Sequence, residues 1–433
     1  MKKYYIAAAL CVLALGACKK NAGDSTDPEE TLEPAPVTLC SQQPLDVIQT
    51  KGMGILDGWK DDMQLYVYAI AREGENSAST SQARLDFNSI LIPNWPVYER
   101  KADPVEGTDR YPILVYRDDT SDPKEPFYYD ENRRYEFFGY FVDDACGEGA
   151  PQPQVVDNEK ITLDVKIDGS QDLLLAMAHK GLDNETPGGE SINANRMYSA
   201  YAARKGITPN LRFMHQLSRF NIYVSSGDNG NGQEDLARKL TISRFLVQSN
   251  DEGTLVIAHA NHADFLDPEY DAETQGAYIP HLDITDKPLS GEGAQPFLYI
   301  RDDQQQPVGP EHKVRLIEEE ADLTTAKKLG SVMVMPGKQK YALQLGLEQD
   351  GYNMGSGTAQ ETILTYNIDF SKLIPLEGAE PDTEAQPGHQ YNVELVIYGL
   401  QEVMITVSMS NWEPSGSFHI DPDAESEELE PNA

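Results

Sequence analysis

The sequence predicts an all-β protein with two antiparallel β-sandwich domains in tandem and one short helical insertion. Apolar and β-branched residues gather in short runs, many of them alternating, as is typical of strands. Gly, Pro, Asn and Asp separate these runs. Helices do not alternate with the strands, which excludes a doubly wound parallel sheet. Residues 39–420 are too many for one ordinary core, so we expect two domains.

The first residues predict a secretory signal. Lys2 and Lys3 precede an apolar run over residues 6–14, which is shorter than the ~20 residues of a membrane-spanning helix. Leu15-Gly-Ala-Cys18 then fits a lipobox, in which the cysteine receives a diacylglycerol. We expect residues 1–17 to be a lipoprotein signal peptide and Cys18 to be the lipidated first residue of the mature chain.

Two polar segments flank the predicted domains. Residues 18–38 contain few large apolar side chains and several prolines, which predicts a flexible tether. Residues 421–433 are strongly acidic, which predicts a disordered tail.

The charge excludes some partners. The chain has 35 basic and 71 acidic residues, a net charge of −36. Loss of residues 1–17 removes Lys2 and Lys3 and brings the net charge to −38. Such a chain repels nucleic acids and anionic lipid headgroups, so we expect no nucleic acid partner.

The strand signals fall into two groups separated by a Gly- and Asn-rich stretch at residues 225–233. We therefore predict an N-terminal sandwich over residues 39–226 and a C-terminal sandwich over residues 227–420. A helical pattern is present only at residues 191–205, and Gly206 and Pro209 end it. The expected strands are 65–70, 111–116, 135–142, 161–167, 211–224, 239–247, 255–257, 331–335, 341–347, 362–370, 391–398 and 403–409.

Several sequence blocks resemble, in order and spacing, those of the fimbrillin-like pilins. They are Tyr135-Glu-Phe-Phe-Gly-Tyr-Phe, Gln171-Asp-Leu-Leu-Leu-Ala-Met-Ala178, Leu211-Arg-Phe-Met-His-Gln-Leu-Ser-Arg-Phe220, Val334-Met-Pro336 and Gly388-His-Gln-Tyr-Asn-Val393 followed by Val407 to Trp412. The resemblance implies two transthyretin-like sandwiches, export as a lipoprotein to the outer membrane, and assembly with other subunits into type V fimbriae that support cell adhesion.

The resemblance also implies strand exchange. In this family a protease removes the first strand of the mature domain, and a strand of another subunit fills the groove by β-augmentation. The removable strand would lie within Pro36 to Thr50. No arginine precedes Arg72, so Lys51 is the candidate processing site, while a solvated surface lysine is the simpler interpretation.

The donor strand in this family comes from the C-terminal region. Val403, Ile405, Val407 and Met409 fall on one face of such a strand, although an ordinary core-facing last strand has the same pattern.

The two cysteines that remain besides Cys11 and Cys18 allow one disulfide. Cys40 and Cys146 could form it in an oxidising compartment, and two unbridged thiols are the alternative. A bridge would keep a cut first strand attached, which favours an anchor or terminal subunit.

No motif indicates an enzyme, a cofactor or a metal site. The chain lacks a Gly-x-Ser-x-Gly elbow, a His-Glu-x-x-His helix and a Walker loop. His259 and His262 are better explained by loop polarity than by metal binding. A second function class remains: a surface lipoprotein that does not polymerise but anchors fimbriae or binds a glycan or protein. Trp95, Tyr98, Tyr128 and Tyr129 would then form a sugar-stacking platform.

Overall fold

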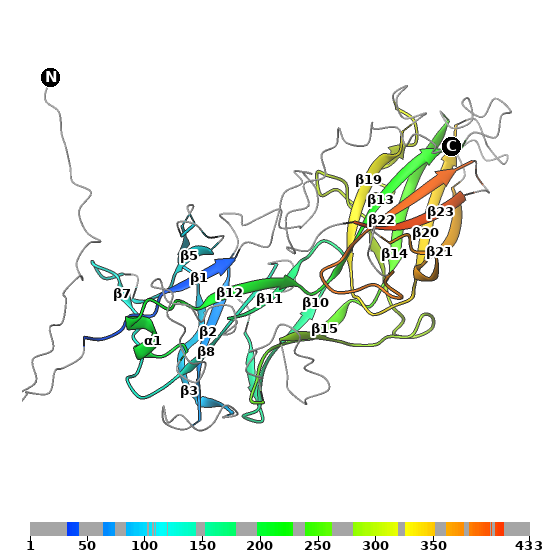
Figure 1. Cartoon of the computed structure of the whole chain (residues 1–433). Coiled ribbons are helices and arrows are strands. Elements are labelled where there is room, and N and C mark those ends of the chain that lie inside the picture. Colours follow the sequence, from blue (N-terminus) through cyan, green and yellow to red (C-terminus); the bar gives the residue numbers. More distant parts are fainter. Residues whose placement is uncertain are drawn as a thin grey trace, which may run out of the picture. The chain divides into compact units, whose positions relative to one another are not determined.

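The computed structural model is nearly all β, as the sequence predicts (Figure 1). It describes residues 33–42, 64–73, 84–101, 104–105, 108, 110–118, 120–143, 152–178, 197–227, 239–261, 280–318, 325–350, 361–375, 381–398, 400 and 403–410. The predicted signal peptide and acidic tail lie outside these ranges, as do Cys18, Lys51 and Cys146.

The first group of strands forms an eight-stranded sheet with the order β3-β2-β8-β11-β12-β1-β5-β4. Alternate residues of its central strands are buried on opposite faces, so these strands are apolar throughout: Val67 and Ala69 of β2 face one core, and Tyr68 and Ile70 face the other. Its strands are β1 (Leu39–Gln42), β2 (Tyr66–Arg72), β3 (Leu85–Pro96), β4 (Glu99–Arg100), β5 (Arg110–Leu114), β8 (Tyr135–Val142), β11 (Leu173–Ala178) and β12 (Asn210–His215).

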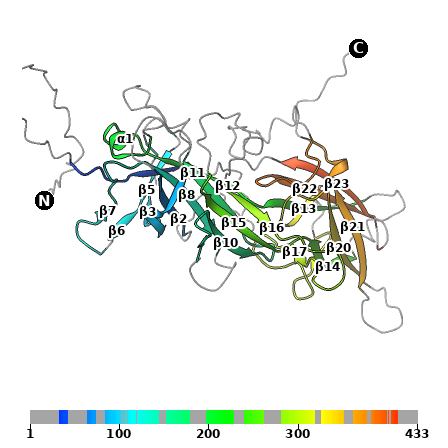
Figure 2. The same ribbon diagram turned by 90° about the horizontal axis from the view of Figure 1, so that it is seen from below.

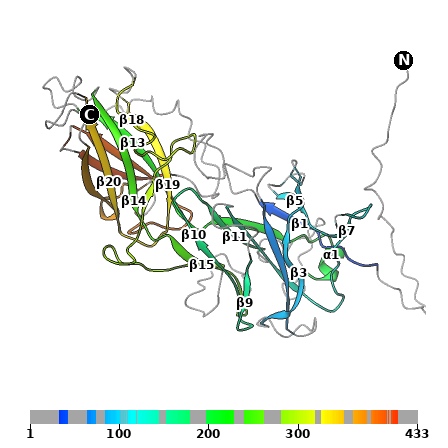
Figure 3. The same cartoon turned by 180° about the vertical axis from the view of Figure 1, so that it is seen from behind.

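A four-stranded sheet, β16-β15-β10-β9, shares a core with the second of these faces. β10 and β15 lie side by side (Figure 3), and their residues Ile161 and Leu255 are fully buried in that core. The members are β9 (Gln154–Val156), β10 (Lys160–Lys166), β15 (Glu252–His259) and β16 (His281–Ile284), and a separate pair joins β6 (Tyr116–Asp118) to β7 (Glu125–Pro126).

The other strands form two sheets, defined here as the β13 sheet (β19-β13-β22-β23) and the β14 sheet (β17-β14-β20-β21). Aromatic rings fill the space between them: Phe220 lies edge-on to Tyr341 with centroids 5.0 Å apart, and Phe370 to Tyr391 at 4.8 Å. The strands are β13 (Ser218–Ser226), β14 (Leu240–Gln248), β17 (Phe297–Tyr299), β18 (Val314–Arg315), β19 (Lys327–Val334), β20 (Lys340–Gln349), β21 (Thr362–Asp369), β22 (Gln390–Ile397) and β23 (Val403–Ser410), with β18 paired to β14 and a 3-10 turn, η4 (Phe370–Lys372), after β21.

Of the segment predicted to be helical, residues 191–205, the structure describes 197–205. Within these the helix α1 spans Ala200–Arg204, and the Ser199 side chain caps it by accepting from the Ala202 amide. Tyr198 has a positive φ of 54°, which no helix residue adopts, so the chain is not helical immediately before the cap. Gly206 follows with a φ of 82°, as its predicted stop role requires.

Strands that precede the predicted boundary at 226/227 pair with strands that follow it. β13 precedes it and lies between β19 and β22, which follow it, and β10 likewise pairs with the later β15. The predicted strand at 211–224 is in fact two strands, β12 and β13, that enter different sheets. The division into domains at residues 226/227 stays a prediction, and it does not separate the sheets.

Candidate functional site

The predicted removable strand is an inner strand of the eight-stranded sheet. β1 pairs parallel with β12 and antiparallel with β5 (Figure 1). Cys40 lies opposite Asn210 of β12 and Pro112 of β5. Among the described strands, β1 alone pairs β5, and through it β4, with the rest of that sheet.

The segment before β1 is also paired. The Val37 amide donates to the Phe127 carbonyl at 2.7 Å, and the Tyr129 amide donates to the Ala35 carbonyl at 2.9 Å. Residues 127–129 hold Ala35 and Val37 through the backbone, and β5 and β12 hold Leu39 to Gln42, so the whole segment is a structural part of the folded chain.

Alternate side chains of this segment enter one core. Ala35, Val37 and Leu39 are buried in it, whereas Pro36 and Thr38 between them are exposed. Burial of an aliphatic side chain contributes roughly 1.5–3 kcal/mol, so Val37 and Leu39 fix this segment firmly.

Ser41 follows the same alternation but does not suit its position. It is 0 % exposed, and its hydroxyl has no hydrogen-bond partner among the described residues. An unpaired buried hydroxyl costs about 1–3 kcal/mol, so β1 is not the best strand that this groove could hold.

Cys40 is buried at 5 % exposure between β5 and β12. Cys146 lies outside the described residues, so the Cys40–Cys146 disulfide stays a prediction.

The first arginine after β1 is not accessible. Arg72 ends β2, and its Nε lies 2.6 Å from Oε1 of Glu136 on β8, with both side chains at most 3 % exposed. A trypsin-like protease cannot engage this side chain in the folded chain. Among basic residues near the segment, Lys51 and Lys60 remain as candidates, and both lie outside the described residues.

The predicted donor face lies against the core of its own chain. In β23, Val407 is buried, and Val403, Ile405 and Met409 are partly buried against the core between the β13 and β14 sheets. This is the packing of a core-facing last strand, and a donor role for these residues is a separate proposal.

Three of the sequence blocks that suggested a family meet at the link between β12 and β13. Nδ1 of His215 lies 2.8 Å from Oδ2 of Asp172, and both residues are buried. Beyond the link, the Gly388 amide donates to the Leu217 carbonyl at 3.0 Å, and the Ser218 hydroxyl donates to the Gln386 carbonyl at 2.7 Å. These contacts hold the crossing between two sheets, and His215 is one of the buried residues that make them.

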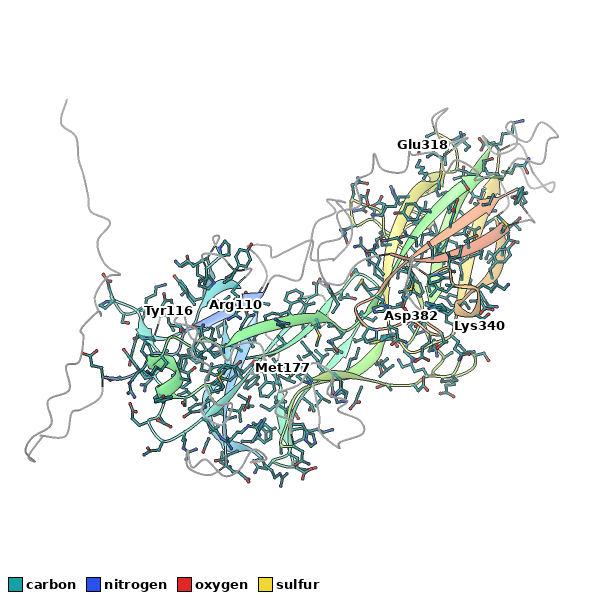
Figure 4. The ribbon with its side chains drawn as sticks, viewed as in Figure 1. Arg110, Tyr116, Met177, Glu318, Lys340 and Asp382 are labelled. Atoms are coloured by element: carbon teal, nitrogen blue, oxygen red, sulfur yellow. The ribbon has the colours of Figure 1, made fainter. Side chains whose placement is uncertain are left out.

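A polar cluster supports the segment that covers this link. Oδ2 of Asp382 accepts the Tyr391 hydroxyl at 2.6 Å and lies 2.8 Å from Nδ1 of His389. The carboxylate and the burial of the ring raise the pKa of Tyr391 above its ordinary value, with burial the larger cause. Asp382 is labelled in Figure 4.

The four aromatic residues of the predicted sugar platform do not share an exposed face. Tyr129 is 5 % exposed within the core. Trp95 is partly buried edge-on to Phe127, and its indole donates to the Tyr116 carbonyl at 2.7 Å. Tyr98 and Tyr128 are exposed, but Nζ of Lys124 covers the Tyr98 ring at 3.0 Å from the centroid. The platform as predicted is therefore wrong, because Tyr129 is buried in the core and the Trp95 indole is bonded to the backbone of its own chain.

Among the described residues there is no group of three or more His, Cys, Asp or Glu side chains placed to hold a metal ion. His262 lies outside them. No helix in the described ranges is long and apolar enough to cross a membrane.

The chain has detectable relatives of known structure. A candidate cell adhesion protein from Bacteroides uniformis aligns with 89 % of this chain and 100 % of its own at 11 % identity and a TM-score of 0.40. A fimbrilin from Porphyromonas gingivalis aligns with 88 % of this chain and 98 % of its own, at 9 % identity and a TM-score of 0.39. The fimbrial anchor protein Mfa2 from the same organism aligns with 86 % of this chain and 97 % of its own, at 9 % identity and a TM-score of 0.29.

No curated protein matches the sequence. A family model described as fimbrillin-like matches residues 56–412, which is most of the chain. The chain therefore belongs to the fimbrillin-like family.

Proposed function

We propose that this chain is a structural subunit, shaft or tip, of type V fimbriae, without catalytic activity, exported as a lipoprotein through Cys18. Family membership supports a fimbrial or adhesive role at the cell surface. Donor-strand exchange would then assemble the subunit with others after a protease cuts at Lys51.

The observation that carries this proposal is the place of β1. It is a short strand near the start of the described chain, yet it lies inside a sheet between β5 and β12. Its loss would leave two strand edges and an apolar groove open at once, which is the acceptor that β-augmentation requires. The buried Ser41 hydroxyl supports replacement by a strand with an apolar residue there.

A first test is the intact mass and N-terminal sequence of the protein from membranes and from sheared filaments. We expect filament subunits to begin at or near Gly52. Lys51→Gln should abolish filaments, and Lys60→Gln is the matched control. A lipidated Cys18 start found only in membranes, with no filament form, would contradict strand exchange.

A second function is favoured by the burial of Arg72. Arg72 is held in a buried ion pair, and no arginine precedes it in the sequence, so the segment between β1 and the end of β2 offers a protease no accessible arginine. If Lys51 is not cut, β1 stays in place and the protein is a non-polymerising surface lipoprotein that anchors fimbriae or binds a glycan or protein. If Lys51 is cut, a Cys40–Cys146 disulfide would still hold the β1 segment to the protein, and masses measured with and without reductant would show this.

A further inference from the structure

The sandwich of the β13 and β14 sheets is open along one side. β21 is the edge strand of one sheet and β23 of the other, and the two lie next to each other (Figures 1 and 2). A groove of about 300 Å³ lies between them. Its lining consists of the inward face of β23 and the end of β21 with η4: Val403, Ile405, Val407, Tyr366, Asn367, Asp369 and Lys372.

Large apolar side chains are also exposed on the outside of this edge. Ile363 on β21 is 50 % exposed, Met404 on β23 is 51 % exposed, and Ile374 beside β23 is 53 % exposed. They make up three of the ten large hydrophobic residues that are exposed in the described ranges. Leu364 of β21 and Ile405 of β23 pack against the core, so Ile363 and Met404 lie on the outer faces of the two sheets.

The backbone N–H and C=O groups of alternate β23 residues face away from β22, toward this open side. The Ile374 amide donates to the Val407 carbonyl at 2.9 Å, and the Met409 amide donates to the Ile374 carbonyl at 3.0 Å. Because backbone groups of alternate residues share one edge of a strand, those of Val403 and Ile405 point outward as well. No strand of the described residues pairs with that edge at these positions.

The other sheet edges of the described chain are protected against pairing. β4, β9 and β17 have two or three residues, and β16 has four with Asp283 among them. β3 carries prolines and three register shifts, and β19 carries Lys327, Lys328 and a register shift. These are the usual devices that prevent edge-to-edge association.

β21 and β23 lack these devices. Each has eight residues and no proline, β23 has no charged residue, and β21 has only Asp369 at its end, paired with Lys340. In a chain of net charge −36, an edge strand without any charged residue, next to one whose single charged residue is paired with a lysine, requires an explanation.

We propose that this edge, defined as β21 and β23, binds the same edge of a second copy of this chain across a two-fold axis. Antiparallel pairing of β23 with its equivalent would place Val403 opposite Ile405 of the second copy and bring the two Met404 side chains together. Both sheets would then continue into the second copy, and the groove would be closed.

A second copy fits better than a charged partner. A two-fold axis places each residue near its own equivalent, so any charge near the axis would meet a like charge. An uncharged edge is therefore what a self-association surface requires. Two chains of strongly negative charge can also approach most closely at β23, which carries no acidic side chain. This lateral contact goes beyond the strand exchange proposed above and does not depend on processing at Lys51.

The test is sedimentation velocity of the full purified chain over a concentration series. Met404→Glu with Thr365→Glu adds like charges at exposed positions of both edges. We expect this double variant to raise the dimer dissociation constant by at least about tenfold, because like charges placed opposite each other at an interface repel. Val155→Glu with Leu289→Glu, also at exposed positions, is the control with the same change in net charge.

A charge exchange makes the test specific. Met404→Lys with Thr365→Lys should also be monomeric alone, and an equimolar mixture with the Glu variant should restore the dimer. Unfolding midpoints equal to that of the parent chain establish that each variant folds.

A parent chain that stays monomeric at all concentrations would overturn the proposal. A dimer that forms only after truncation at Ser410 would also overturn it and would assign the edge to the chain's own C-terminal residues. Cleavage at Lys51 is measured separately, on cells that produce the Met404→Glu, Thr365→Glu variant. It tests the proposed function and does not depend on the dimer.

Discussion

Arg72 and Glu136 place opposite charges inside the eight-stranded sheet. Their side chains are at most 3 % exposed, and 2.6 Å separates Nε from Oε1. Loss of one partner leaves the other charge buried without its counterion, which costs far more than the pair contributes relative to apolar residues.

Glu136→Gln should therefore lower the free energy of unfolding by about 3–5 kcal/mol, measured by urea denaturation. The control is Glu159→Gln, because Glu159 and Arg84 form an ion pair with both side chains about half exposed. That control should lose less than about 1 kcal/mol. Equal shifts of the two midpoints would show that the buried pair has no special role.

Asp369 shows how a carboxylate stabilises the turn that closes the groove. Its Oδ1 accepts from the amide and hydroxyl of Ser371, and its Oδ2 lies 2.9 Å from Nζ of Lys340, which is labelled in Figure 4. The Ser371 hydroxyl and then Lys340 lower the pKa of Asp369 from 3.8 to about 2. Because the folded pKa is the lower one, this stabilisation is present above pH 3.8 and is lost as the pH falls toward 2.

Asp369→Asn should lower the thermal midpoint at neutral pH, and its difference from the parent chain should shrink between about pH 4 and about pH 2. Thermal melts across this range measure it. Asp350→Asn, in a pair with Arg315 whose side chains are more than half exposed, is the control with a smaller expected effect. A difference that grows on acidification would contradict the assignment.

At the scale of the element, β1 combines strong and weak features. Leu39 and the backbone ladders to β5 and β12 hold it, while the Ser41 hydroxyl is buried without a hydrogen-bond partner among the described residues. This mixture is what the strand exchange proposed above requires: a strand that is held in the folded chain but does not fit its groove fully.

Ser41→Ala should raise the free energy of unfolding by roughly 1 kcal/mol, since it removes an unpaired buried hydroxyl. The matched control is Thr38→Ala in the same segment, where the side chain is exposed and the effect should lie within about 0.5 kcal/mol. If Ser41→Ala is destabilising, the hydroxyl has a partner and β1 is better fitted to its groove than we infer.

At the scale of the whole molecule, repulsion among the excess acidic side chains opposes folding. The chain has 71 acidic and 35 basic residues, and many described ion pairs lie at the surface, where each contributes little. Self-repulsion among the unpaired acids keeps the chain soluble and lowers its stability.

Sodium chloride should therefore raise the thermal midpoint by the order of a few degrees between about 10 mM and about 100 mM, as the screening length falls from ~30 Å to ~10 Å. Calorimetry at constant pH measures this, with sucrose in place of salt as the uncharged control. A midpoint that falls with salt would mean that attractive ion pairs outweigh repulsion.

The strand pattern was predictable because it is local. The prediction for 135–142 coincides with β8, and that for 403–409 coincides with β23 apart from its last residue. Alternation of apolar residues over these runs needs no tertiary information. Short strands such as β4 and β17 escaped prediction, because their few residues carry no period and pair only where a neighbour is present.

The sequence by itself determined the all-β class, the family blocks and the acidic character of this protein. It located the segment of β1 and the face of β23, since both depend on residues close together in the chain. Only the tertiary structure decided that β1 lies between β5 and β12, that Tyr129 points inward and that β21 and β23 form one open edge. These are long-range pairings, and a period of two residues specifies the faces of a strand but not its neighbours.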